Sequence, residues 1–548
     1  MPRFRVLAIN IALCSTLIAC QSINTDKLAH QSSSDINDEQ NLSDKVVGAD
    51  QLTEFGPDKH CSIEEFSTDG FELTGTTDLW ERIRKGFELH EVNHPRVETY
   101  LEWYIKHPKY LQRVGERGSA YLHHITSRLE EENLPLELAL LPIVESAFDP
   151  FAYSHGRAAG IWQFIPGTGK AYGLDQNWWY DGRRDIVAST EAAIRYLKYL
   201  NKFFDGNWLH ALAAYNSGEG TVKRSKRKNH RAGKPTDYWS LRLPKETAAY
   251  VPQLLALSKI VADPDKYGVT LYPIENKPVF EVVKVGTQID LSQAADLAGI
   301  SIDRLYKLNP GYNRWATTPN GNNQLVIPIE KVDIFTERLS QLSPQERIGW
   351  ERYKIVSGDS LIKIAKKFNT DVSTLKSVNN IRNNTIRAGD ALMIPVAKQP
   401  LNQYTHSQAQ RTTRKQSSSP SNKSQKVIYT VKAGDSFWTI AKRYGVKVRT
   451  LASWNAMAPT DPLQINQKLV VWTHAKVSNS NSNLAFNHNS DTIRKIHYRV
   501  RKGDSLARIA QKFNLTVQKI KSWNQVAHNK YLQPGDKLTL FVNVTNLQ

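Results

Sequence analysis

Cysteine is scarce in this 548-residue chain, and the few cysteines present cannot form a disulfide framework. They are Cys14, Cys20 and Cys61. Cys14 lies inside an apolar stretch that is typical of an export signal and Cys20 ends it, so the mature chain would keep one free thiol. No group of Cys and His residues has the spacing of a zinc site. We therefore expect no intramolecular disulfide, no structural metal and no cofactor, while an oxidising compartment stays allowed.

Long hydrophobic runs are also missing. The apolar stretch at residues 6–18 is shorter than the ~20 residues that a membrane-spanning helix needs. It follows two arginines and ends at Leu17-Ile18-Ala19-Cys20, the arrangement of a secretory signal. These four residues resemble the bacterial lipobox, which implies lipid on Cys20; an ordinary signal with an incidental cysteine is the alternative. Gln21, where inner-membrane retention would need Asp, favours a periplasm-facing lipoprotein of the Gram-negative outer membrane.

Acidic residues are few in the C-terminal third. Lys and Arg outnumber Asp and Glu by 32 to 9 over residues 351–548, whereas the corresponding numbers for residues 1–350 are 40 and 44. A basic segment favours a polyanionic partner such as nucleic acid, anionic lipid or an acidic wall polymer. The export signal argues against nucleic acid. The length predicts several domains, because one domain usually takes ~100–200 residues.

The C-terminal part contains a repeat. Its three copies read Tyr353-Lys-Ile-Val-Ser-Gly-Asp-Ser-Leu, Tyr429-Thr-Val-Lys-Ala-Gly-Asp-Ser-Phe and Tyr498-Arg-Val-Arg-Lys-Gly-Asp-Ser-Leu, and an Asn follows 20 residues after each Asp. Alternation predicts a strand, the Gly a turn and the next Asp or Ser a helix cap. Apolar residues at i, i+3, i+4 and i+7 predict the helix that follows. Each copy should fold as a small βααβ module.

These modules resemble the LysM family, which binds N-acetylglucosamine polymers such as peptidoglycan. The resemblance places the sugar beside the loop after Gly-Asp-Ser; the alternative is that Asp and Ser only cap the helix. A degenerate copy without Gly-Asp-Ser is expected at residues 279–330, where it would support the preceding domain. The residues implied in glycan binding are Asp359, Ser360, Leu361, Asp435, Ser436, Phe437, Asp504, Ser505 and Leu506.

Apolar residues recur at helical spacing over residues 76–268, which predicts a mainly α domain. Within it, the stretch Leu140–Phe148 places Glu145 among apolar neighbours. Burial would raise the pKa of this carboxyl and keep it protonated near neutral pH, as a general acid requires. A surface or helix-capping glutamate is the simpler alternative. Periodicity does not choose between Glu145 and its neighbours Glu130, Glu131, Glu132 and Glu137.

Further motifs accompany this glutamate: Glu145-Ser146, Ser154, Gly160–Pro166, Tyr180–Ala193, Ala214–Gly218 and Glu246–Val251. In order and spacing they resemble the lytic transglycosylases with a goose-type-lysozyme-like fold. Trp162 departs from the family, in which many members carry Met. The resemblance implies that Glu145 is the only catalytic carboxyl. It implies substrate contacts from Ser146, Ser154, Gln163, Tyr215, Asn216, Glu246 and Tyr250.

The implied reaction cleaves peptidoglycan between N-acetylmuramic acid and N-acetylglucosamine. Glu145 would protonate the glycosidic oxygen and then, once ionised, accept the C6 hydroxyl proton as a 1,6-anhydro ring closes. The substrate's 2-acetamido group would replace the second carboxylate that most glycosidases use. A hydrolytic muramidase and a non-catalytic, peptidoglycan-binding lipoprotein are the alternatives. The sequence specifies no oligomeric state.

The expected architecture is multidomain: a mainly α, lysozyme-like catalytic domain followed by small βααβ LysM modules on flexible linkers. Two spacers rich in Ser, Asn and Gln should behave as flexible linkers. The expected divisions are the signal 1–20, a tether 21–75, the catalytic domain 76–268, the degenerate module 279–330, LysM modules at 352–396, 428–473 and 497–543, and linkers at 397–427 and 474–496.

Overall fold

The computed structural model describes residues 78–89, 92–319, 323–421 and 424–473, and from the C-terminal part residues 493–500, 504–513, 515, 517–524, 533 and 535–543. The expected signal 1–20 with Cys20, the tether 21–75 and most of the linker 474–496 lie outside the described residues. Contacts divide the chain into a first unit, up to 420 with 426–472, and a second, 421–425 with 473–548. None of the helices in the described ranges combines the length and hydrophobicity needed to cross a bilayer.

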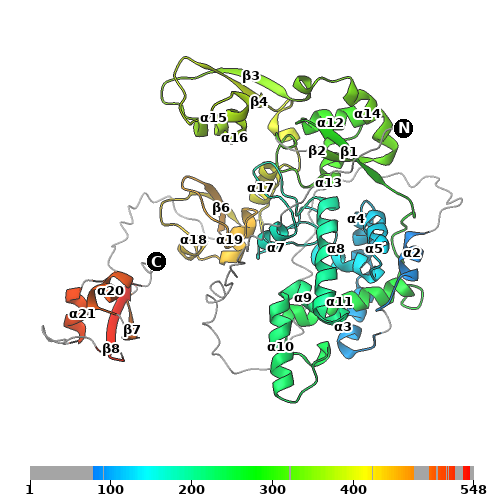
Figure 1. Ribbon diagram of the computed structural model, residues 1–548, viewed down its shortest axis with the longest axis horizontal. Helices are drawn as coiled ribbons and strands as arrows, with labels where there is room; N and C mark the ends of the chain where they lie inside the picture. Colours follow the sequence, from blue (N-terminus) through cyan, green and yellow to red (C-terminus); the bar gives the residue numbers. More distant parts are fainter. Residues whose placement is uncertain are drawn as a thin grey trace, which may run out of the picture. The chain divides into compact units, whose positions relative to one another are not determined.

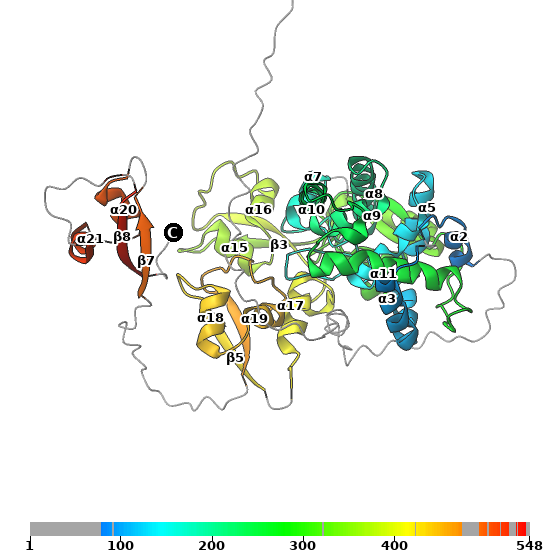
Figure 2. The ribbon, with the colours of Figure 1, turned by 90° about the horizontal axis from the view of Figure 1, so that it is seen from below.

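Residues 79–262 form a helical domain around α11 (Lys245–Ala262), which packs against α3 (Pro95–Lys106) and α9 (Trp208–Ser217) (Figures 1 and 2). α11 buries side chains on several faces because it is apolar almost all round. α8 (Ile186–Phe203) packs against α9. The shorter elements are α2 (Leu79–Lys85), α4 (Pro108–Gly118), α5 (Leu122–Glu131), η2 (Leu136–Leu140), α6 (Leu141–Ser146), α7 (Pro166–Ala171), α10 (Glu219–Arg231) and η3 (Tyr238–Ser240).

The short helix α6 ends abruptly after Glu145. Ala147 and Phe148 both adopt left-handed backbone angles, with φ of 51° and 55°. Such angles cost a residue with a side chain roughly 1–2 kcal/mol. They are held because the Phe148 ring is only 1% exposed and packs on Gly118, where a Cβ would lie 2.9 Å from the ring. Core packing therefore fixes the end of the helix that carries Glu145.

The degenerate copy folds as a βααβ unit. It consists of β1 (Phe280–Gly286), α12 (Leu291–Ala298), α13 (Ile302–Leu308) and β2 (Asn323–Pro328), with the two strands antiparallel. η4 (Ile329–Lys331), α14 (Val332–Ser340) and η5 (Pro344–Arg347) follow, and α14 packs on α12. This added helix gives the unit a larger core than the sequence pattern alone predicts.

The three repeat modules have the predicted βααβ order, which confirms the predicted fold class. Each contains a two-stranded sheet. Repeat module 1 is β3 (Gly349–Lys354), α15 (Leu361–Lys367), α16 (Val372–Val378) and β4 (Ala391–Val396). Repeat module 2 is β5 (Gln425–Thr430), α18 (Phe437–Tyr444), α19 (Val448–Trp454) and β6 (Lys468–Thr473). Repeat module 3, in the second unit, is β7 (Ile493–Arg499), α20 (Leu506–Lys512), α21 (Val517–Asn524) and β8 (Lys537–Asn543).

One asparagine closes each module, which explains its fixed spacing. In module 2, Asn455 Nδ2 donates to the backbone oxygens of Leu451 and Val470 at 2.8 Å, and Oδ1 accepts from Val470 N at 2.7 Å. Asn379 and Asn524 make the same bonds in modules 1 and 3. The degenerate unit does so with Asn309. The degenerate unit therefore keeps these asparagine hydrogen bonds although it lacks Gly-Asp-Ser.

The expectation of a flexible linker at 397–427 is corrected by the structure. Residues Leu401–Gln403 form η6 and Gln408–Ser417 form α17. Between them, Tyr404 is completely buried, and its hydroxyl donates to Asp290 Oδ2 at 2.7 Å. His406 is also buried, with Nε2 2.7 Å from Asp303 Oδ1. The composition of this segment is polar, but two aromatic side chains are enough to fasten it to the degenerate unit.

We expect Asn455→Ala to destabilise repeat module 2 by about 2–4 kcal/mol, because the buried Val470 N–H and two backbone oxygens lose their partner. Hydrogen exchange of the full chain, followed by mass spectrometry, should show faster exchange confined to residues 428–473. The control Gln464→Ala removes an exposed amide from the same module and should leave exchange unchanged. Equal protection in both variants would mean that the asparagine does not close the module.

Candidate active site

Glu145 stands one residue before the end of α6, beside the central helix α11. The Tyr250 hydroxyl of α11 donates to Glu145 Oε1 at 2.6 Å. Glu246 lies one turn earlier on α11 and is exposed. Tyr215 of α9 is close enough for the charge of Glu145 to raise the pKa of its hydroxyl. Four residues that the sequence predicted for the site therefore come together from three helices: Glu145, Tyr215, Glu246 and Tyr250.

The carboxyl of Glu145 is enclosed by protein, while the residue keeps some surface open to solvent. Burial raises the pKa of Glu145 from the ordinary 4.5 to about 8. The hydrogen bond from Tyr250 acts in the opposite direction, and the negative charge of Glu246 adds to the rise in pKa. The group is therefore protonated at neutral pH. The raised pKa expected from the apolar sequence around Glu145 is confirmed.

Both tyrosines remain neutral hydrogen-bond donors. Burial, reinforced by the charge of Glu145, raises the pKa of Tyr250 well above 10, and the same two causes act on Tyr215. The Tyr215 hydroxyl donates to the backbone oxygen of Trp162 at 3.0 Å. Tyr250 thus orients the Glu145 carboxyl directly, while Tyr215 holds the loop that follows α6.

That loop, residues 152–166, is tied to α6 by Ser146. The buried Ser146 hydroxyl donates to the backbone oxygens of Ile161 at 3.0 Å and Pro142 at 3.2 Å. Trp162 is fully buried, and its ring N–H donates to Thr190 Oγ1 at 3.0 Å. The fold therefore uses the Ser146 hydroxyl and the Trp162 ring to set the position of the loop.

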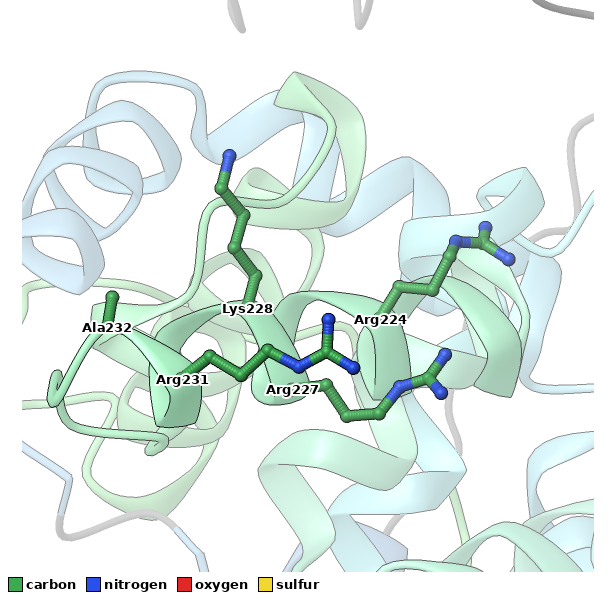
Figure 3. A pocket seen from close by; sticks show the side chains of 5 residues that line it. All are labelled: Arg224, Arg227, Lys228, Arg231 and Ala232. Atoms are coloured by element: carbon green, nitrogen blue, oxygen red, sulfur yellow. The ribbon is translucent and has the colours of Figure 1, made fainter.

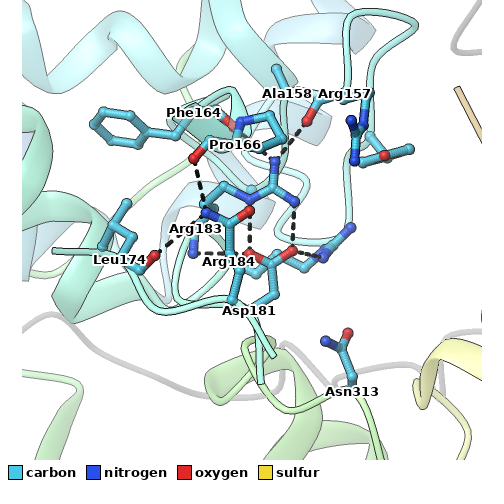
Figure 4. A network of polar contacts seen from close by, with 12 residues as sticks. Arg157, Ala158, Phe164, Pro166, Leu174, Asp181, Arg183, Arg184 and Asn313 are labelled. Atoms are coloured by element: carbon cyan, nitrogen blue, oxygen red, sulfur yellow. Dashed lines mark hydrogen bonds and ion pairs between the residues drawn. The ribbon is translucent and has the colours of Figure 1, made fainter. Parts of the chain in front are cut away.

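A buried ionic network braces the same loop from the other side (Figure 4). Asp181 accepts from Arg183 Nε and Nη2 at 2.8 Å and from Arg184 Nη1 at 2.5 Å. Arg183 Nη1 then donates to the backbone oxygens of Arg157 and Phe164 at 2.7 and 3.2 Å. Burial raises the pKa of Asp181, but the two guanidinium groups outweigh burial and lower it. Asp181 stays charged and fixes the loop.

Gly160 explains how closely the loop approaches this network. Its φ is +80°, and a Cβ at this position would lie 2.1 Å from the backbone oxygen of Arg183. Only glycine fits here. Gln163, three residues later, also has a left-handed φ of 50°, and its Nε2 donates to the Gly160 oxygen at 2.7 Å.

The remaining residues predicted to contact the substrate form hydrogen bonds with other residues of the protein. Ser154 is partly exposed, and its Oγ accepts from Ala158 N at 3.0 Å within the loop. Asn216 Oδ1 accepts from the Thr247 hydroxyl at 2.7 Å, which joins α9 to α11. Ser154 and Gln163 lie on the loop that Ser146 and the Asp181 network position.

The other glutamates near Glu145 in sequence have different surroundings. Glu130, Glu131 and Glu132 form ion pairs with Arg82, Arg128 and Lys198. Glu137 is buried and accepts from the backbone N–H of Glu88 at 2.7 Å and of Leu89. The hydrogen bond from Lys198 lowers the pKa of Glu132 below its usual value. These four glutamates are paired with other parts of the fold, whereas Glu145 lies beside Tyr250, which favours Glu145 as the candidate acid.

In the repeat modules the Gly-Asp-Ser residues have folding roles. Asp359, Asp435 and Asp504 each accept the hydroxyl of the first-strand tyrosine, at 2.8, 2.6 and 2.7 Å. The following serines accept from the backbone N–H three residues later and cap the first helix. Leu361 and Phe437 are buried, and Leu506 is partly buried.

The next residue along α15 and α18 is apolar and faces solvent, a feature that the sequence reasoning missed. Ile362 is 72% exposed and Trp438 is 56% exposed. Each lies one position off the i, i+3, i+4 face that packs in the module, and this offset was the available signal. These side chains are free to contact a partner where the predicted Leu361 and Phe437 are not.

Known protein families match separate stretches of the chain. Residues 125–237 match the transglycosylase SLT domain. Residues 279–344 match the LysM-like domain of lytic transglycosylase MltD. Residues 353–395, 429–472 and 498–541 match the LysM domain.

Similar proteins were found over nearly the whole chain. Membrane-bound lytic murein transglycosylase D of Escherichia coli strain K12 is 36% identical over 489 residues, which cover 89% of this chain and 91% of the relative. The protein of that name from Escherichia coli O6:H1 gives the same values. Over 175 residues, an autolysin of Enterococcus faecalis is 32% identical, covering 32% of this chain and 22% of the autolysin.

The raised pKa of Glu145 predicts a stability gain for Glu145→Gln that depends on pH. The folded-state pKa of about 8 lies above the usual 4.5. The free energy of unfolding of the wild-type protein therefore falls progressively as pH rises from 4.5 through 8. The variant cannot ionise. Calorimetry of the helical domain should show little difference at pH 4 and a variant more stable by about 2–4 kcal/mol at pH 9.

The matched control is Glu116→Gln, which removes an exposed carboxyl from α4 in the same domain. It should show no such dependence on pH. Parallel stability curves for wild type and Glu145→Gln between pH 4 and 9 would contradict a buried, protonated Glu145.

Proposed function

The chain belongs to the membrane-bound lytic murein transglycosylase D family and is a lytic transglycosylase that cleaves peptidoglycan, and from this we propose that Glu145 is its single catalytic acid and base. One observation carries the proposal: a carboxyl with a pKa of about 8, held by a hydrogen bond from Tyr250, on a residue that is itself partly exposed. Such a group holds a proton at neutral pH and can deliver it to a substrate.

The first step is departure of the leaving sugar. Glu145 donates its proton to the glycosidic oxygen between N-acetylmuramic acid and N-acetylglucosamine, and the bond from this oxygen to the muramyl C1 breaks. Tyr250 keeps the carboxyl in one orientation, because its hydroxyl holds Oε1 and leaves the other oxygen for the substrate. As the proton leaves, the same hydrogen bond stabilises the carboxylate that forms.

The second step closes a ring without water. The substrate's 2-acetamido group stabilises positive charge at C1, which a second enzyme carboxylate does in most glycosidases. The C6 hydroxyl of the same muramyl residue then attacks C1, and its proton passes to Glu145. The product end is a 1,6-anhydro sugar and Glu145 is restored. A carboxylate whose pKa is about 8 is a better base for this step than an ordinary glutamate.

The positions of the other residues support two kinds of role. Ser154, Gln163 and Asn216 are polar and partly exposed around Glu145's helix and loop, and we assign them to the sugar substituents. Glu246 is exposed and raises the pKa of Glu145 by its charge, so it tunes the acid as well as bordering the site. Ser146 is a positioning residue, because its hydroxyl is used by the Ile161 and Pro142 oxygens.

The repeat modules bind peptidoglycan and bring the catalytic domain to the wall. Once one module is bound to the wall, the others on the same chain meet it at a raised effective concentration. Several weak sites therefore bind tightly together. The exposed Ile362 and Trp438 next to the helix caps offer apolar surface on which a sugar ring can stack.

We also propose that the N-terminal sequence anchors the enzyme to a membrane. Cleavage before Cys20 and lipidation of its thiol would anchor the chain to the periplasmic face of the outer membrane. The lipobox Leu17-Ile18-Ala19-Cys20 and Gln21 support this proposal. Stable anchoring takes two or more lipid signals, as a multiply acylated lipoprotein provides.

Glu145→Gln should lower the release of anhydromuropeptides from purified sacculi by roughly 10²–10⁴-fold, because the proton donor and acceptor is lost. Mass spectrometry of the digest gives both the amount and the chemistry of the ends. Glu116→Gln, the exposed control, should act like wild type. Release at the wild-type rate from a folded Glu145→Gln protein rules out the assignment, and reducing ends from the wild type would indicate a hydrolytic muramidase.

Replacing the lipidated cysteine should release the protein from membranes. With Cys20→Ser, we expect the chain to lose metabolic labelling with a fatty acid and to be washed from the membrane fraction by about 1 M salt, which screens electrostatic contacts. Cys61→Ser should keep both properties, because Cys61 lies beyond the lipobox. Fatty-acid labelling that persists in Cys20→Ser would disprove lipidation at this site.

A further inference from the structure

Helix α10 carries a stripe of positive charge that the catalytic site does not use. Its 13 residues include six Lys or Arg and one acid, Glu219 in the first turn. Five of the cations are exposed, and four of these follow one another at i, i+3, i+4 and i+7, so these four share one face. They line an open hollow of about 400 Å³ with Ala232 (Figure 3). The stripe consists of Arg224, Arg227, Lys228 and Arg231.

The opposite face of α10 attaches the helix to the domain without these four residues. Val222, Ser225 and Asn229 are buried. Ser225 Oγ donates to the Arg242 oxygen at 3.0 Å, and Asn229 Nδ2 donates to the oxygens of Pro235 and Ser240 at 2.8 Å. The helix is therefore held in place by its inner face, and its fold does not require an outer stripe of charge.

No carboxylate in the described part of the chain forms an ion pair with the stripe. Elsewhere in the domain the pattern differs: Arg82 and Arg128 bind glutamates at 2.5 Å, as does Lys198 at 2.6 Å. Like charges at i, i+3 and i+4 repel each other and lower helix stability. A favourable interaction with the helix dipole applies only to the last turn, so it does not account for Arg224.

We propose that the stripe on α10 docks on the headgroups of an anionic phospholipid bilayer. Its charge is complementary to such a surface, and the planar guanidinium groups of three of its four members match phosphate oxygens in pairs. The stripe contains no apolar side chain that could enter the hydrocarbon. Binding is therefore electrostatic and stays at the level of the headgroups, where each Lys or Arg strengthens binding by about fivefold.

The length of the chain before the domain permits this contact. From Cys20 to Asp78 the chain has 57 intervening residues, which can span at most ~200 Å at 3.3–3.6 Å per residue. If Cys20 is lipidated as proposed, the stripe can reach the bilayer that holds the anchor, and the tether raises its effective concentration there. The affinity of the stripe for the bilayer does not itself depend on lipidation.

The test uses the full chain with Cys20→Ser, so that an acyl chain cannot contribute. Co-sedimentation is measured with phosphatidylcholine vesicles and with vesicles containing about one-third phosphatidylglycerol, at about 0.1 M salt. Arg227→Glu/Arg231→Glu should weaken binding to the anionic vesicles at least tenfold. Arg227→Lys/Arg231→Lys should keep most of the binding, because the charge remains.

The matched control is Lys109→Glu/Arg113→Glu, which makes the same change in net charge on exposed positions of α4. It should weaken binding by less than about threefold, since the charge lies outside the stripe. Both charge-reversal variants, the one in the stripe and the one in α4, should digest sacculi at the rate of Cys20→Ser, which shows that they are folded. Equal losses of vesicle binding in these two charge-reversal variants would show that only net charge matters and would overturn the proposal.

Two other outcomes would also overturn it. If Arg227→Glu/Arg231→Glu keeps its vesicle binding but loses affinity for intact sacculi, the stripe binds the anionic wall polymer. If the variant keeps its vesicle binding but loses affinity for double-stranded DNA, the stripe is a nucleic-acid site. Because every arm carries Cys20→Ser, a failure of the proposed lipid anchor does not change these results.

Discussion

The removal of the Glu145 carboxyl from water is the physical condition on which the proposed chemistry depends. Desolvation favours the neutral acid and moves the pKa to about 8, while the Tyr250 hydrogen bond limits the shift. A pKa that is too low or too high would each impair the proposed reaction. A lower pKa would leave too little acid to protonate the glycosidic oxygen, and a higher one would slow loss of the proton. One carboxyl can therefore serve as acid and then as base.

The rest of the helical domain holds this carboxyl and its loop in place. Left-handed residues end α6 one residue beyond Glu145, after Ser146, and packing of Phe148 against Gly118 supports them. Ser146 ties the loop to α6 from one side, and the Asp181 network ties it from the other. These contacts explain why polar groups near the site are buried and paired: they keep the site rigid before substrate arrives.

Periodicity and motif order were sufficient for the architecture but not for the roles of individual side chains. The βααβ modules follow from alternating and helical spacing. Glu145 was singled out by its apolar surroundings and motifs. The role of Ser146 could not be predicted, because a serine beside a catalytic residue looks the same whether it faces a sugar or a backbone oxygen. The ordered segment around Tyr404 was missed because composition averages over residues, whereas two buried aromatic side chains, Tyr404 and His406, are enough to fasten it.

The most direct test of the central claim is a titration of the Glu145 carboxyl itself. Carbon-13 NMR of protein labelled at glutamate Cδ, compared with Glu145→Gln to assign the resonance, reports its ionisation without substrate. The account predicts a midpoint at about pH 8, with the resonance in its protonated position at pH 7. A midpoint near the ordinary value of 4.5 would show that Glu145 is ionised at neutral pH, and the single-acid mechanism would then be wrong.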